Sequence, residues 1–346
     1  MPIPVPVIED EEVEAPPPPP PKEIPPYGTK EWIQYVSEID GHLPTPIPVS
    51  ITGSEKYSCP PLQWYNFDVY PHKVKLTNTG FTALIGAKWR TERPYIEGGP
   101  FLEKHVFSQI HFHWGANLME GSDHIVDNRK HPGEMHVTFF RSEYLTQEEA
   151  FQHPDGVAIF CYLITHGLEP DPRLEWVIEG FKRVQESKNY TRIGPRPMSK
   201  LIPMFFEDYF LYWGTLHTTK GKDFVCRWII PRCVLSADED QMKQFHKLWD
   251  PYDEPIVRNF RPLQAKEERT VFFISPHWSQ YNSLLPLPKS LPETSISILS
   301  QEYATKPWML PPQNAYMMSE QTKKDDDAKA QRTSDEKQMI TDSSDK

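Results

Sequence analysis

Short runs of apolar and β-branched residues, separated by Gly, Pro and Asn, dominate the middle of the chain and predict strands. Helical signals are fewer: Thr146 and Ser236 each stand three residues before a glutamate, as in a capping box, and Asp171-Pro172 opens a stretch with apolar residues at helical spacing. The pattern therefore predicts a mainly β fold, with a single large, mostly antiparallel sheet and peripheral helices. The predicted strands are residues 81–89, 106–114, 135–140, 157–165, 224–231 and 271–274.

Both ends of the chain differ from the middle. Residues 1–27 contain an acidic run at 9–12 and six consecutive prolines at 16–21, and residues 314–346 are polar and charged. Proline removes amide donors and fixes φ, and a charged segment without apolar periodicity cannot bury a core. We therefore expect disordered ends around one globular domain at 28–313. The proline-rich segment is either a spacer, which we favour, or the attachment point for a protein partner.

The composition excludes several function classes. The 346 residues include 37 basic and 48 acidic side chains, a net charge of −11, which argues against a nucleic-acid or anionic-membrane partner. No run approaches the roughly 20 apolar residues of a membrane helix, so no membrane insertion is expected. The start, residues 1–6, lacks the pattern of a signal peptide, and none of the four cysteines forms a CxxC pair. We expect reduced thiols and a cytoplasmic location.

Two histidines lie two residues apart on one predicted strand, and a third histidine lies on the following predicted strand. Because strand side chains alternate between faces, His111 and His113 point the same way, together with Gln109. On the next strand, His136 shares a face with Glu134. The connection contains glycines and prolines that suit an antiparallel reversal, so pairing of the two strands would bring three imidazoles to one point.

Three neutral imidazoles form the protein part of a catalytic zinc site with one open position. Such ligands are usually held by an outer partner on the other ring nitrogen. Gln109 and Glu134 each precede a histidine by two residues and can play that part. A His-x-His pair alone is common on solvated strands, but the third histidine with its glutamate makes a Zn²⁺ site the stronger interpretation.

At these residues the sequence resembles the α-class carbonic anhydrases, over roughly residues 28 to 288. The resemblance implies a large twisted, mainly antiparallel sheet with zinc at the bottom of a cone, held by His111, His113 and His136. It also implies zinc-dependent, reversible hydration of carbon dioxide to bicarbonate, with Gln109 and Glu134 behind the ligands. The matching segments are residues 109–115, 121–127, 134–136, 155–159 and 259–262.

The resemblance also assigns roles in the second shell, with departures. Asp123 stands where the family has a glutamate that anchors a threonine. The threonine loop has one extra residue, so that alignment from the left places His217 at the threonine and alignment from the right places Thr218 there. We prefer Thr218, because a hydroxyl can donate to the carboxylate and accept from the nucleophile. By similarity the substrate pocket contains Thr138, Ile159, Thr219 and Trp228.

Phe81 occupies the position of the family's proton-shuttle histidine. Phenylalanine cannot carry a proton, and an acid of pKa about 7 that releases its proton directly to water is limited to roughly 10³ s⁻¹. The sequence thus predicts a slow carbonic anhydrase. The alternative is a non-catalytic carbonic anhydrase-related protein that acts as a binding module.

Overall fold

A computed structural model describes residues 25, 31–32, 35, 39–218 and 221–276. Apart from residue 25, the expected segment 1–27 lies outside the described residues, as do residues 277–313 of the expected domain and the expected tail 314–346. In the described part, no helix is long and apolar enough to cross a membrane.

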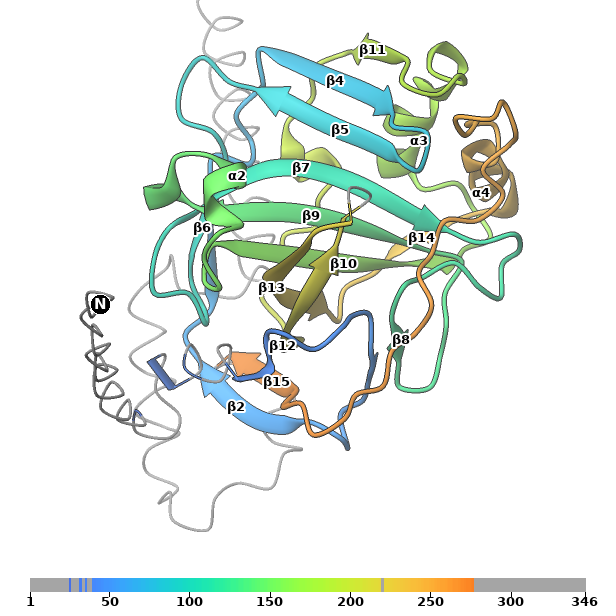
Figure 1. Ribbon diagram of the computed structural model, residues 1–346. Coiled ribbons are helices and arrows are strands. Elements are labelled where there is room, and N and C mark those ends of the chain that lie inside the picture. Colours follow the sequence, from blue (N-terminus) through green and yellow to red (C-terminus); the bar gives the residue numbers. More distant parts are fainter. Residues whose placement is uncertain (1–24, 26–30, 33–34, 36–38, 219–220, 277–346) are drawn as a thin grey trace, which may run out of the picture.

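In the described part of the chain, thirteen strands form one large, twisted, mixed sheet, which confirms the predicted mainly β class. Neighbours are antiparallel except at the pairs β10–β13, β10–β14 and β2–β15. The direction of the strands turns across the sheet, so β12 and β13 cross the line of β7 and β9 (Figure 1). The main path runs through β11 (Tyr190–Ile193), β4 (Lys73–Asn78), β5 (Ala83–Lys88), β7 (His105–Trp114), β9 (Gly133–Arg141), β10 (Val157–His166), β13 (Asp223–Pro231), β12 (Tyr209–His217), β15 (Phe272–Pro276) and β2 (Glu55–Cys59).

Three strands extend the sheet outside this path, and two more form a small parallel pair. β14 (Leu235–Ala237) pairs with β10, and β6 (Tyr95–Gly98) joins β3 (Leu62–Tyr65) to β7. The separate pair consists of β1 (Pro48–Val49) and β8 (Ile125–Val126).

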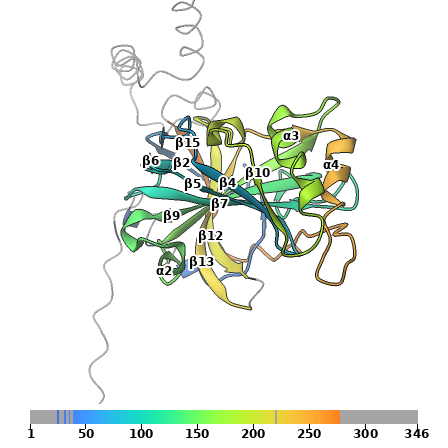
Figure 2. The same ribbon diagram turned by 90° about the horizontal axis from the view of Figure 1, so that it is seen from above.

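The helices are short and peripheral. α2 (Gln147–Ala150) lies at one end of the sheet, whereas α3 (Pro172–Ile178) and α4 (Glu239–Phe245) lie together at the other (Figure 2). The described residues also form three single-turn 3₁₀ helices, η1 (Ser142–Tyr144), η2 (Phe181–Arg183) and η3 (Met198–Lys200).

Two of the three predicted helix starts are confirmed. The Thr146 side chain accepts the N–H of Glu149 at the start of α2, and the Asp171 side chain accepts that of Arg173 at the start of α3. The third is wrong, because Ser236 belongs to β14 and Asp238 caps α4. Ser236 pairs with β10 and is therefore part of the sheet, so the helix begins two residues later than predicted and Asp238 caps it.

The face of β7 that carries no histidine is built into the core. Ile110, Phe112 and Trp114 are all buried, and the Trp114 indole N–H donates to Ile256 O at 2.7 Å. This bond ties the late segment 255–261 to the end of β7. Residues Gln109, His111 and His113 alternate with this apolar row and are half-buried, as strand geometry requires.

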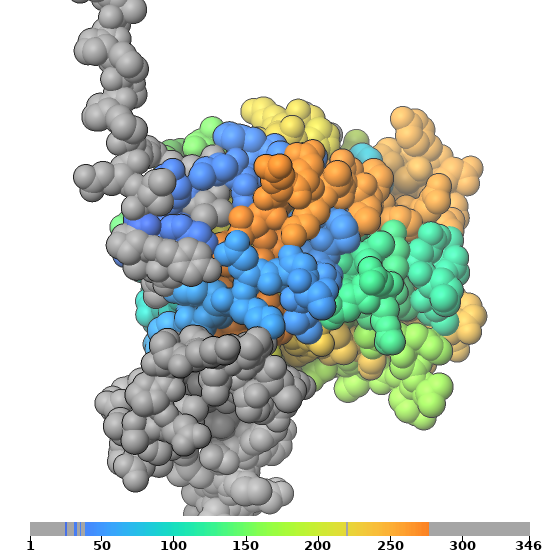
Figure 3. All heavy atoms as spheres, turned by 90° about the horizontal axis from the view of Figure 1, so that it is seen from below, coloured from blue at the N-terminus to red at the C-terminus, as the bar shows by residue number. Residues whose placement is uncertain are grey.

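Segments from the two ends of the described chain lie side by side on one face. Figure 3 shows the blue residues after position 39 beside the orange residues that lead to position 276. Parallel pairing of β2 with β15 accounts for this neighbourhood. The histidine-bearing strands lie in the middle of the sheet, between these elements and β4 and β5, which holds them rigidly.

Candidate metal centre

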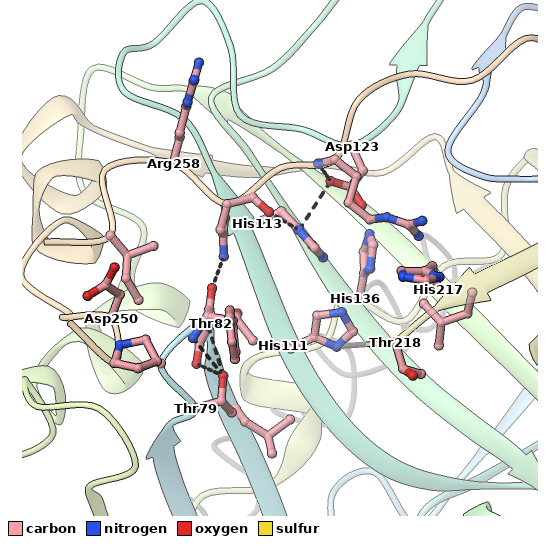
Figure 4. A pocket seen from close by; sticks show the side chains of 18 of the residues that line it. Thr79, Thr82, His111, His113, Asp123, His136, His217, Thr218, Asp250 and Arg258 are labelled. Carbon is pink, nitrogen blue, oxygen red and sulfur yellow. Dashed lines mark hydrogen bonds and ion pairs between the residues drawn. The ribbon is translucent and has the colours of Figure 1, made fainter. Parts of the chain in front are cut away.

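The structure brings three histidines from two neighbouring strands to one point. His111 of β7 lies directly opposite His136 of β9, and His113 lies two residues further along β7. Their ring centroids are 4.9 Å apart for His111 and His136, 4.5 Å for His113 and His136, and 5.2 Å for His111 and His113. One ring nitrogen of each lies within 4.8 Å of the other two (Figure 4). The three side chains are therefore placed to share one ion.

The two nitrogens of His136 have different surroundings. Nε2 donates to Glu134 Oε1 at 2.8 Å. Nδ1 is buried and has no hydrogen-bond partner among the described residues. A buried polar atom without a partner is costly, and a metal ion is one group that would satisfy it.

Glu134 is the centre of a buried hydrogen-bond network that the sequence did not reveal. Its carboxylate accepts from the His124 N–H at 2.9 Å, from His124 Nδ1 at 2.6 Å and from His136. The Tyr212 hydroxyl donates to His124 Nε2 at 2.6 Å. Tyr212 is 88 residues from His124, and no local pattern announces such a contact. This network fixes the tautomer and the direction of the His136 ring.

The late segment of the chain positions His113. His113 Nδ1 donates to Asn259 O at 3.2 Å and lies 3.3 Å from Asp123 Oδ1. The Asn259 side chain in turn donates to Phe81 O and Phe112 O, both at 2.9 Å, and accepts the Trp114 N–H at 2.7 Å. The sequence motif contained Asn259, but its role as a clamp between three backbone segments became visible only in the structure.

Burial disfavours the charged form of all three imidazoles. It lowers the pKa of His113 to about 4 and the pKa of His111 well below its usual value, and it also lowers the pKa of His136. The proximity of His136 and His113 to His111 adds to the effect. For Glu134, burial acts to raise the pKa, but the interactions with His124 and His136 lower it well below its ordinary range. Neutral imidazoles beside an ionised carboxylate are the protonation states that metal binding requires.

Only some of the other expected site residues line the cavity next to the three histidines. Gln109 lines the cavity, but no hydrogen bond joins it to His111 in the described part of the chain. Thr138, Ile159 and Trp228 stand in one row across β9, β10 and β13. Thr138 and Ile159 are buried, and of the three only Trp228 reaches the cavity. The expected pocket residue Thr219 lies outside the described residues.

The histidines open into a cavity of about 1060 Å³. Its walls come from the turn before β5, from the end of β12, from Trp228 of β13, and from residues 250–261. The cavity gives the metal centre access to solvent and to small molecules.

A second group of metal-binding side chains shares His136. His124, Glu134, His136 and Cys161 also have ligand atoms within 4.8 Å of one another. In this group, however, the network described above already uses both His124 nitrogens and both Glu134 oxygens. Burial and the charge of Glu134 raise the pKa of Cys161 well above its usual value, so the thiol stays protonated. The group that faces the cavity is the better metal site.

The sequence model of the eukaryotic-type carbonic anhydrases matches residues 27–275. The chain belongs to this family. It is 30% identical to mitochondrial carbonic anhydrase 5B of Rattus norvegicus over 203 residues, 57% of this chain and 63% of the relative. It is 27% identical to a putative carbonic anhydrase 5 of Caenorhabditis elegans over 213 residues, 61% and 68% of the two chains. Carbonic anhydrase 3 of Sus scrofa is 28% identical over 203 residues, 57% and 76%.

The loop that should present a threonine differs from the carbonic anhydrase expectation. β12 and β13 remain paired as far as His217 and Asp223, and the Thr218 hydroxyl donates to Lys222 O at 3.0 Å. Asp123 Oδ1 accepts the Arg261 N–H at 2.8 Å. The two side chains thus have other partners, and the expected hydrogen bond between Thr218 and Asp123 is not formed. Thr218 directly follows the last paired residue of β12, and its hydroxyl is directed to the strand partner side of the hairpin.

His217, the alternative at the threonine position, occupies the rim of the cavity. Its Nδ1 lies 2.6 Å from Asp223 Oδ1, and both side chains are more than half exposed, at 55% and 59%. An exposed ion pair of this kind contributes little to stability. His217 therefore does not replace the threonine as a partner of Asp123 in this chain.

Acid should destabilise the metal-free protein, and His105 allows one part of this to be measured. His105 is buried, and desolvation with the charge of Arg227 lowers its pKa to about 3. As the pH falls, the unfolded chain, with a histidine pKa near 6.5, binds a proton before the folded protein does. The contribution of His105 to the free energy of unfolding is therefore fully present above about pH 6.5 and decreases as the pH falls below that value. Asp123, whose pKa burial raises to about 6, acts in the opposite sense.

We therefore expect His105→Gln to reduce the pH dependence of the unfolding free energy between pH 6 and 5 by about one proton. Urea unfolding at several pH values measures this slope. An unaltered slope in His105→Gln would show that His105 is protonated in the folded state.

Proposed function

We propose that this chain is a zinc-dependent carbonic anhydrase that converts carbon dioxide and water reversibly to bicarbonate, with slow turnover. The observation that carries the proposal is the convergence of three imidazole nitrogens, one of them the unpartnered Nδ1 of His136, at the base of an open cavity. A catalytic zinc site typically has three neutral histidine ligands and one coordination position left open to water or substrate. Family membership supports the reaction at the level of its class.

His111, His113 and His136 would hold the zinc. When bound, zinc acts as a Lewis acid and lowers the pKa of a coordinated water to about 7, an effect for which carbonic anhydrase is itself the standard example. Glu134 and Asn259 orient two of the three rings through the nitrogens that face away from the centre. That support keeps the ligands in place without reorganisation during the reaction.

The floor of the cavity suits a small apolar substrate. The Trp228 ring packs 5.8 Å from the His136 ring, and its indole N–H donates to Gly214 O at 3.1 Å, so no polar atom of the indole remains free. Leu216 adds a second apolar side chain to the cavity wall. An apolar surface beside the metal would hold carbon dioxide and limit competing water.

Two features support slow turnover. Thr218 is turned toward Lys222 and is not available to orient the nucleophile through Asp123. Phe81 lies on the cavity wall, where it can neither accept nor donate a proton. The displaced threonine also favours the second candidate, a carbonic anhydrase-related protein that binds zinc without turnover.

The experiment that separates these candidates is a stopped-flow hydration assay on the purified full chain, with zinc content measured on the same sample. The proposal expects bicarbonate formation above the buffer rate that disappears when zinc is removed and returns when zinc is restored. Stoichiometric zinc without hydration above the buffer rate would leave only the second candidate.

Phe81→His tests the limit on proton release. Phe81 is 51% exposed on the cavity wall, so an imidazole there would reach both the interior and solvent. We expect kcat in weak buffer to rise about tenfold with kcat/KM unchanged, because only the proton transfer is relieved. Tyr70→His, at an exposed aromatic residue that is not on the cavity wall, should change neither constant. An unchanged kcat for Phe81→His would argue against a proton-limited cycle.

A further inference from the structure

The cavity contains a cation that no described residue pairs with. Arg261 is half-buried on the cavity wall, and its Nη1 is buried without a hydrogen-bond partner in the described part of the chain. Its backbone N–H holds Asp123, which fixes the main chain and leaves the guanidinium free. Asp123 in turn lies 3.3 Å from His113 Nδ1, so Arg261 stands next to the candidate metal centre.

Neither acidic residue on the wall satisfies this guanidinium. Asp123 Oδ1 accepts the backbone N–H of Arg261 and lies 3.3 Å from His113 Nδ1. Asp250 Oδ1 accepts the N–H groups of Tyr252 and Glu254, at 2.8 and 3.0 Å. No ion pair links either carboxylate to Arg261 in the described residues. An unsatisfied buried donor of this kind calls for an acceptor, and a guanidinium matches a carboxylate best.

Apolar side chains line the mouth of the same cavity. Phe81, Tyr252 and Val257 all lie on its wall and are 51%, 85% and 47% exposed. Exposed apolar side chains gathered at the rim of a cavity are typical of a ligand site. Carbon dioxide and bicarbonate are too small to cover these three side chains together with the centre at the base of the cavity, so the rim offers contact area for a larger apolar ligand.

The rim and the cation belong to one connected wall. The Asn259 side chain donates to Phe81 O at 2.9 Å, which joins the turn that carries Phe81 to the segment that carries Val257 and Arg261. The Asp250 turn holds the backbone of Tyr252 in place. The backbone positions of the apolar rim and of Arg261 are thus set before any ligand binds, and preorganisation lowers the cost of binding.

We infer that the cavity binds a carboxylate with an aromatic or similarly sized apolar body. The carboxylate accepts from the Arg261 guanidinium, a small rotation of which brings Nη1 to the ligand, and the apolar body lies on Phe81, Tyr252 and Val257. The site shares the cavity of the proposed hydration reaction but does not require zinc, so such a ligand would also block access to the metal centre.

Isothermal titration calorimetry on the full chain, zinc-free and zinc-loaded, tests this with benzoate and acetate as probes. We expect benzoate to bind the zinc-free protein about tenfold more tightly than acetate, because its ring buries apolar surface on the rim. Arg261→Gln should weaken benzoate binding by about tenfold or more. Arg261→Lys keeps the charge but loses the two parallel N–H donors of the guanidinium, and it should weaken benzoate binding by less. Phe81→Ala with Tyr252→Ala should remove the advantage of benzoate over acetate.

Two controls match these variants. Arg258→Gln removes a second arginine of the same wall whose side chain points away from the histidines (Figure 4). Tyr190→Ala removes an exposed aromatic ring on β11, away from the cavity wall. Both should leave benzoate affinity within about twofold.

The inference is overturned if benzoate binds only the zinc-loaded protein and Arg261→Gln has no effect, since the carboxylate would then lie on the metal. It is also overturned if benzoate and acetate bind equally, or if neither binds at millimolar concentration. The titration of the zinc-free protein does not depend on turnover. A failure of the hydration proposal would therefore leave these binding results unchanged, and the two failures can be told apart.

Discussion

Replacing His111 with alanine is expected to abolish stoichiometric zinc binding. His111 is one of three convergent donors, and two remaining imidazoles leave zinc without the three protein ligands that a catalytic site has. The loss should exceed the roughly 10–100-fold cost of removing an outer partner of a ligand. Zinc content after dialysis against a buffer of fixed free zinc measures it. The zinc-dependent rise in melting temperature of the native protein should disappear in the variant, since only a bound ligand stabilises the fold by mass action.

His217→Ala is the matched control for this change. His217 also lies on the cavity wall, but its ring is paired with Asp223 and is exposed. It should leave zinc content unaltered. If His111→Ala kept full zinc content, the metal would belong to the buried group of His124, Glu134, His136 and Cys161, and the proposed ligand set would be wrong.

Glu134→Gln should lower both the stability of the fold and its affinity for zinc. Glu134 is fully buried and accepts three hydrogen bonds, from the His124 backbone, the His124 ring and the His136 ring. A glutamine amide offers one oxygen and one NH₂ group, so at least one N–H would face another donor in a buried site. We expect a loss of about 3–5 kcal/mol in the free energy of unfolding and a 10–100-fold weaker zinc affinity.

Urea unfolding and zinc competition with a chelator measure the two effects. Glu149→Gln is the control, because Glu149 also faces a histidine, His153, at 3.6 Å, but on an exposed surface. No measurable loss of stability is expected there. If Glu134→Gln proved as stable as the control, the buried network would not hold the metal-binding strand.

Much of the fold followed from local patterns. Alternation along β7 separated Ile110, Phe112 and Trp114 from the three polar residues between them, and the structure shows that separation. The same alternation, with an antiparallel reversal, was enough to bring His111 opposite His136. Capping at Thr146 and Asp171 was also readable, because the cap and its partner are two or three residues apart. Such features are local, and local chemistry decides them.

What could not be predicted depends on contacts between distant segments. The hydrogen bond from Tyr212 to His124 and the clamp formed by Asn259 join residues 88 and more than 140 positions apart. The one-residue insertion allowed two alignments, which place either His217 or Thr218 at the threonine position, and a single sequence does not fix the register of the loop. In the structure β12 and β13 pair as far as His217 and Asp223, and the Thr218 hydroxyl donates to Lys222 O and not to Asp123.

The central claim is that three imidazoles, and no thiol, hold one ion at the base of the cavity. X-ray absorption at the zinc edge of the reconstituted full chain tests it most directly. The account predicts nitrogen or oxygen ligands alone at about 2.0–2.1 Å, with one position open to an added small anion. A zinc–sulfur distance of about 2.3 Å would place the metal on Cys161, and a shell closed to added anion would remove the open position; either result would contradict the account.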